Sequence, residues 1–201
     1  MSELVAFGTI GFRHIVDINS ADHLLFLLAL GAIYCPRDWR SALLVVSAFT
    51  VGHSITLAAA ALGLVTPPTR WIEFLIPMTI VATGVENLLR RDRAATGLAV
   101  RLRPAFAFVF GLVHGAGFAT YLRSLLGSAV VVPLLGFNLG VEAGQVVILL
   151  ASALGFTVLD GVLARLPRAR HDARWAFRWR LTSVSLVVTM VAAVWAGQRW
   201  P

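Results

Sequence analysis

Six stretches of mostly apolar residues run along the chain, and arginine clusters or prolines bound most of them. A helix needs about 20 mostly apolar residues to cross a membrane. The pattern therefore predicts six transmembrane helices, at residues 14–35, 41–64, 71–89, 104–124, 131–163 and 181–198. The fifth stretch is long enough to be tilted or broken.

The first stretch is the least regular. Its clean apolar run, from Leu24 to Tyr34, is too short to cross a bilayer. Two structures remain open at this point. Either the helix extends back through Asp22 and His23 to His14, or the chain enters the membrane as a broken segment.

Composition supports the same fold class. Of 201 residues, 58% are apolar and only 13% are charged, whereas an ordinary soluble domain is about a quarter charged. This excludes a soluble globular domain and a disordered chain. We expect an all-α polytopic membrane protein, with residues 1–201 forming one helical-bundle domain. The lone Cys35 excludes an internal disulfide framework, and no secretory signal peptide is expected at the N-terminus.

The arginines indicate orientation. The chain has 17 arginines and no lysine, and 13 of the arginines lie in the segments 37–40, 90–103 and 165–180. The other four are Arg13, Arg70, Arg123 and Arg199. The positive-inside rule places the larger group in the cytoplasm and both termini in the periplasm. We therefore expect a multi-pass protein of the bacterial inner (cytoplasmic) membrane. The net charge of +7 then has a topological origin, and no nucleic-acid partner is expected.

Ionisable side chains at membrane depth are costly and usually face a bundle interior or a water-filled cavity. His53 and His114 fall near the middle of their helices, and Glu142 falls in the outer half of its helix, at a depth similar to that of the Asp22–His23 pair. Imidazole and carboxylate ligands suit nickel, cobalt or zinc. The candidate metal ligands are His14, Asp22, His23, His53, His114 and Glu142.

Helical spacing indicates which polar groups support these ligands. Asn138, Glu142 and Gln145 share one helix face, and so do Thr50, His53 and Ser54. We expect Thr50, Ser54, Asn138 and Gln145 to hydrogen-bond the ligands and orient the imidazole rings. Glu86 and Asn87 lie deeper, towards the cytoplasm, where an ion would leave.

Two sets of glycines predict close helix packing. Gly136, Gly140 and Gly144 form a smooth ridge in the fifth stretch, and Gly111 and Gly115 form one in the fourth. Such ridges let another helix approach closely in membranes.

Several longer stretches are typical of a known family and occur in its order. They are GFRHIVDINSADHLLFLLAL (11–30), FTVGHSITLAAAALGLV (49–65), WIEFLIPMTIVATGVENLL (71–89), FGLVHGAGFA (110–119) and FNLGVEAGQ (137–145). On these stretches the chain resembles the HupE/UreJ group of small bacterial membrane proteins.

The resemblance implies a permease for nickel, and by extension cobalt, linked to hydrogenases and ureases. The hallmark of that group is a histidine followed by an Asp-His pair in the first span, which corresponds here to His14 and to Asp22 with His23. Seven residues separate His14 from Asp22, more than in the family pattern, and Asp17 is the alternative to His14.

Three functions remain open from the residues. The first is a permease in which a divalent ion, with nickel first and cobalt or zinc as alternatives, meets Asp22, His23 and His14. It then passes His53, His114 and Glu142, and leaves past Glu86 and Asn87. No GxxxxGK[ST] motif is present, so energy would come from a gradient or from an accessory subunit. A homo-oligomer is equally open.

The second function is a membrane-embedded metal-dependent hydrolase, which needs an open coordination position. The third is an electron-transfer subunit with haem between His53 and His114. A continuous polar path favours the permease, and a closed pocket that opens to lipid favours the enzyme. We favour a transporter over an enzyme.

Overall fold

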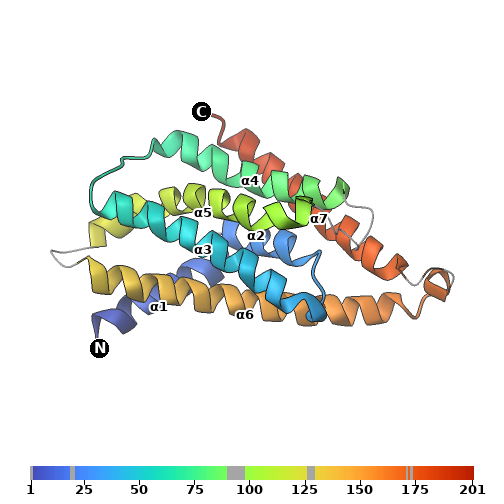
Figure 1. The fold of residues 1–201 in the computed structure, drawn as a ribbon. Helices are drawn as coiled ribbons and strands as arrows, with labels where there is room; N and C mark the ends of the chain where they lie inside the picture. The colour runs from blue at the N-terminus through green and yellow to red at the C-terminus, as the bar shows by residue number, and fades with distance from the viewer. Residues whose placement is uncertain (1, 19–20, 90–97, 126–129, 171, 173) are drawn as a thin grey trace.

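A computed structural model describes residues 2–201 except 19–20, 90–97, 126–129, 171 and 173. All regular structure in this part of the chain is helical, which confirms the all-α class (Figure 1). The elements are α1 (Glu3–Val16), α2 (Asp22–Gly31), η2 (Pro36–Asp38), α3 (Trp39–Ala61), α4 (Thr69–Leu89), α5 (Leu98–Leu125), α6 (Val131–Leu163), η3 (Pro167–Arg170) and α7 (Trp175–Gln198). Among the described residues, five helices, α3 to α7, are long and apolar enough to cross a membrane.

The first predicted span is two short helices instead of one long one. α1 begins at Glu3, well before the predicted start at residue 14, and ends at Val16. α2 begins at Asp22 and has 10 residues, about half of what a spanning helix needs. The broken segment is therefore the alternative that the structure shows. A sixth long span is not confirmed.

The long helices form close pairs in which glycines meet backbone. α1 packs on α6, α3 on α5 and α4 on α7 (Figure 1). A methyl group on Gly140 of α6 would collide with the backbone of Gly8 and Phe12 in α1. One on Gly111 of α5 would collide with the backbone of Phe49 in α3. Both predicted ridges are thus packing surfaces, and they fix the helices that carry His14 and His53.

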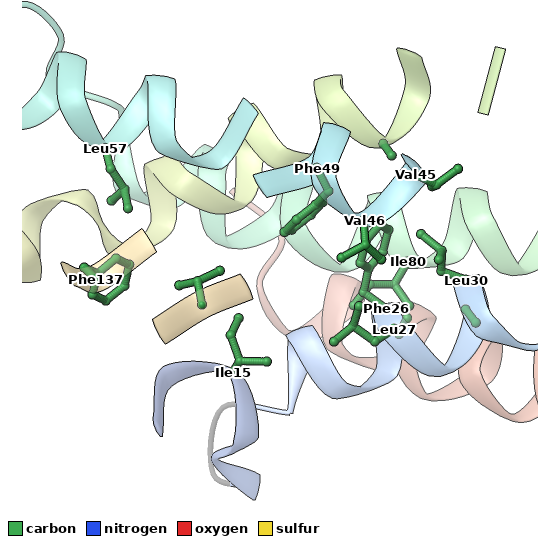
Figure 2. Close-up of a cluster of buried hydrophobic side chains, with 14 of the residues drawn as sticks. Ile15, Phe26, Leu27, Leu30, Val45, Val46, Phe49, Leu57, Ile80 and Phe137 are labelled. Carbon is green, nitrogen blue, oxygen red and sulfur yellow. The ribbon is translucent and has the colours of Figure 1, made fainter. Parts of the chain in front are cut away.

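α2 lies in the middle of the bundle and supplies much of its core. Phe26, Leu27 and Leu30 are each at most 3% exposed. Figure 2 shows them gathered against Val46 of α3 and Ile80 of α4. Burial of these side chains holds the short helix in place, and with it the histidine in its first turn.

Arginine-bearing segments meet at one end of the bundle (Figure 1). Arg103 of α5 donates to both carboxylate oxygens of Glu86 at 3.1 Å and to Oδ1 of Asn87 at 2.6 Å. Asn87 in turn donates to the carbonyl of Ala29 at 2.6 Å. Glu86 and Asn87, predicted for an exit path, therefore join α2, α4 and α5 in a polar network.

A second ion pair at that end joins Arg180 of α7 to Asp160 of α6 at 3.0 Å. Arg90, Arg91 and Arg93, which belong to the predicted cytoplasmic group, lie outside the described residues. The side of the membrane that this end faces stays a prediction.

Candidate metal site

Three histidines from three helices meet inside the bundle. They are His14 in the last turn of α1, His23 in the first turn of α2 and His53 in the middle of α3. One ring nitrogen from each lies within 4.8 Å of the other two. Nitrogen ligands bind zinc at about 2.0–2.1 Å, so two of them can be about 4.2 Å apart. The group is therefore close to the dimensions of one metal site. We call His14, His23 and His53 the three-histidine group.

Aromatic side chains surround these imidazoles. The ring of Phe118 lies 4.0 Å from that of His14, and Phe137 stacks on Phe118 at 5.0 Å. On the far side, the ring of Phe49 lies 6.0 Å from that of His53 and 6.2 Å from that of His23. These rings pack around the imidazoles.

Several ring nitrogens in the three-histidine group have no hydrogen-bond partner among the described residues. They are Nε2 of His14, Nε2 of His23 and both nitrogens of His53. His53 is fully buried. Buried polar atoms are nearly always hydrogen-bonded, and the exceptions mark a functional role or a bound ion or water. Neutral imidazoles with free lone pairs are the donor set that borderline divalent ions prefer.

A hollow connects His14 with the surface. It has a volume of about 440 Å³ and is lined by Ile10, Arg13, His14, Val16, Asp17, Phe118 and Tyr121. The lining brings one positive and one negative side chain, Arg13 and Asp17, to the approach. Asp17 thus lies beside the site, at the end of α1, where it is exposed. We call this space the outer hollow.

Two predicted carboxylate ligands lie elsewhere. Asp22 accepts two hydrogen bonds from Arg199, at 3.2 and 3.3 Å, at the end of α7. Glu142 is exposed on α6, while Gln145, one turn further along, is buried. Among the described residues, the structure adds neither carboxylate to the three-histidine group.

The predicted supporting residues differ in their contacts. The Thr50 hydroxyl lies within hydrogen-bond distance of Oε1 of Gln145, at 2.7 Å, and this contact ties α3 to α6. Ser54 donates to the carbonyl of Thr50 at 2.7 Å, and Oδ1 of half-buried Asn138 has no partner among the described residues.

The fourth histidine contacts a residue that the sequence did not reveal. His114 of α5 hydrogen-bonds Thr79 of α4 at 2.9 Å. Nothing in the spacing of Thr79 separates it from the other threonines of these helices. Only the fold brings it to His114.

A family model described as HupE / UreJ protein matches residues 1–199. The chain belongs to the HupE/UreJ family. This family is associated with nickel and cobalt transport, in agreement with a bundle of apolar helices around imidazoles. No match to the chain was found among curated proteins or among solved structures.

The geometry of this HupE/UreJ member also bears on the haem alternative. The ring of His23 lies 5.9 Å from that of His53 and 5.1 Å from that of His114. His23 is therefore close to both of the histidines that would serve as axial ligands. The imidazoles are arranged as a cluster instead of two facing axial ligands.

Proposed function

We propose that this protein carries a divalent transition-metal ion across the membrane, and that the three-histidine group binds the ion on its way. Nickel is the first candidate, with cobalt and zinc as alternatives. The observation that carries the proposal is the convergence of three imidazoles, with unpartnered nitrogens, from α1, α2 and α3.

The position of the group supports transport. His14 lines the outer hollow, so an ion that enters the hollow reaches the first imidazole directly. Neutral ligands bind a dication less tightly than carboxylates do in a low-dielectric site. A permease needs release as well as capture, and moderate binding serves both.

The hydrolase alternative has less support. Metal-dependent hydrolysis usually employs a general base beside the metal-bound water, often a carboxylate. Within the part of the chain that the structure describes, no carboxylate belongs to the three-histidine group. Asp17 lines the outer hollow and is the nearest candidate for such a role.

His53→Gln tests the proposal most directly, because His53 is fully buried and both its nitrogens are unpartnered. We expect the variant to bind nickel at least about tenfold more weakly, in the range for disrupted metal sites, and to lose uptake into proteoliposomes. Isothermal titration with nickel, cobalt and zinc measures the first effect and a metal-sensitive dye inside the vesicles the second.

The matched control is His171→Gln, because His171 is the one histidine of the chain other than the three-histidine group and His114. It should bind and transport as the unmodified chain does. Metal binding without uptake, together with hydrolysis of a test ester or peptide, would favour the enzyme. An unmodified chain that binds none of the three ions would contradict both metal-dependent functions.

A further inference from the structure

His114 lies next to the three-histidine group without belonging to it. Its side chain is 1% exposed, and its ring centroid lies 5.1 Å from that of His23. We propose that Nδ1 of His114 forms, with His23, a second position for the ion, and that Thr79 positions the His114 ring for this role. The inference rests on the proposed function and adds a second binding step to it.

The hydrogen bonds of Thr79 determine which nitrogen of His114 carries the proton. The Thr79 hydroxyl lies 2.7 Å from the carbonyl oxygen of Ile76 and 2.9 Å from Nε2 of His114. A carbonyl oxygen can only accept, and a hydroxyl has a single proton. That proton is therefore donated to Ile76, and Thr79 accepts a hydrogen bond from Nε2 of His114. In a neutral ring, Nδ1 then carries the lone pair.

Nδ1 of His114 is placed to use this lone pair. It is buried and has no hydrogen-bond partner among the described residues. Besides His23, the rings near that of His114 are those of Phe49, at 5.1 Å, and Phe26, at 5.4 Å, and neither phenylalanine offers a donor. An imidazole nitrogen with a lone pair and no hydrogen-bond partner can bind a metal ion. Thr79, bonded to the other nitrogen, fixes the tautomer of the ring, as such partners do in known metal sites.

His23 links the two positions. Its ring centroid lies 4.6 Å from that of His14 and 5.1 Å from that of His114. An ion held by the three-histidine group can therefore exchange His14 for His114 while His23 stays bound. Each intermediate keeps an imidazole ligand, so the ion never loses all its ligands at membrane depth.

The space beyond His114 leads towards the arginine-bearing end. Phe26, which contacts the His114 ring, also lines a small hollow of about 20 Å³ together with Glu86 and Arg103. The outer hollow ends at His14 on the opposite side of the cluster. A path therefore runs from the outer hollow past His14, His23, His114 and Phe26 to the small hollow at Glu86 and Arg103. The second position lies on the side of this path that is nearer to the small hollow.

The first experiment determines which ring nitrogen of His114 carries the proton and which histidines bind zinc. The full chain, labelled with ¹⁵N-histidine, is measured by two-bond nitrogen–proton correlation in detergent micelles, with His114 assigned from the spectrum of His114→Gln. We expect the Nε2–H tautomer at His114 without metal. Zinc, a diamagnetic probe, should shift His14, His23 and His53 first and Nδ1 of His114 at a higher concentration.

The second experiment compares Thr79→Val, which keeps the shape but lacks the hydroxyl, with Thr79→Ser, which keeps the hydroxyl. In Thr79→Val the zinc-induced shift at His114 should need about tenfold more zinc, and uptake should fall in parallel, while the first binding event is unchanged. Thr79→Ser should restore both. The control is Thr56→Val on α3, where the hydroxyl donates to the backbone carbonyl of Gly52 at 3.4 Å.

The outcomes separate the two proposals. Shifts at the three-histidine group with none at His114, an Nδ1–H tautomer, or normal uptake by Thr79→Val would overturn the second position and leave the permease intact. A zinc titration that moves none of the four histidines would overturn both. The unchanged first event in Thr79→Val also shows that this variant is folded.

Discussion

At the scale of single residues, charged side chains inside the bundle are paired with one another, while the imidazoles are not. Asp22 pairs with Arg199 and Glu86 with Arg103, whereas both nitrogens of His53 are unpartnered. Paired charges are far cheaper at membrane depth than single ones. The ion pairs therefore hold helix ends together and leave the neutral rings as the groups that can accept a ligand.

Asp22→Asn tests whether Asp22 belongs to the ion pair or to the metal site. The pair is partly exposed, with side chains 19% and 33% accessible, so we expect a loss of about 1 kcal/mol or less. Nickel affinity should change by less than about threefold, which is under 1 kcal/mol. Thermal unfolding in detergent and nickel titration measure the two effects.

Arg199→Gln is the matched variant, since it removes the other half of the same pair. Both variants should lose similar stability, and the double variant should lose little more than either. If Asp22→Asn alone abolished nickel binding, Asp22 would be a ligand after all.

At the scale of helices, the site depends on how closely two helix pairs approach. α1 carries His14 and lies directly on the glycines of α6, and α3 carries His53 and lies on the glycines of α5. In a bilayer, such contacts are held by packing instead of by exclusion of water. A small increase in the spacing of one pair therefore moves one imidazole relative to the others.

Gly140→Ala should test this dependence. The added methyl would collide with the backbone of Gly8 and lie about 2.8 Å from the amide nitrogen of Phe12, so α1 must move away from α6. We expect a lower melting temperature together with weaker nickel binding, because His14 moves with α1.

The control lies on the same helix. No atom of the described residues lies within 4 Å of a methyl added to Gly155, and alanine favours a helix over glycine by up to about 1 kcal/mol. Gly155→Ala should leave nickel binding unchanged and keep or raise the melting temperature. Equal behaviour of the two variants would contradict the role of the glycine contact.

The helices and the histidine cluster were accessible from sequence, for a definite reason. Prolines and arginines mark the ends of the long helices, and depth along a helix follows from residue number at about 1.5 Å per residue. Residues of equal depth, such as His53 and His114, are therefore expected to be near one another.

The break between α1 and α2 and the side-chain contacts between distant residues could not be predicted from depth along the helices. The polar residues between Val16 and Leu24 interrupt the apolar pattern, but they fit both a broken segment and a continuous helix with a polar face, so hydropathy did not decide between the two. The Asp22–Arg199 pair joins positions 177 residues apart, and the contact of Thr79 with His114 depends on how α4 is rotated. The depth of a residue does not say how its helix is rotated about its own axis. For this reason Glu142, which was expected at the site from its depth, lies exposed instead.

At the scale of the whole molecule, the two ends differ in charge. Thirteen of 17 arginines belong to three segments, and the described parts of these segments gather at the end where α6 finishes and α7 begins (Figure 1). The α3–α4 connection, which contains Thr66, lies at the other end (Figure 1). Such an asymmetry sets the orientation of a membrane protein.

Cysteine labelling tests the expected orientation. In a Cys35→Ser background, a cysteine at position 171 should resist a membrane-impermeant maleimide added from the periplasmic side. A cysteine in place of the exposed Thr66 should react readily. The reverse pattern would place the arginine-rich end in the periplasm and invert the direction of the path.

The break between α1 and α2 has an electrical consequence for a site built from neutral rings. A helix carries roughly half a negative charge at its C-terminus and half a positive charge at its N-terminus. α1 ends at Val16, so its negative pole lies in the turn that bears His14. The positive pole of α2 lies at Asp22, whose carboxylate is paired with Arg199. An unbroken helix would place no pole at this depth. The interruption thus places His14 at a negative backbone pole that favours a cation, and His23 at the opposite pole of the next helix, without a carboxylate among the ligands.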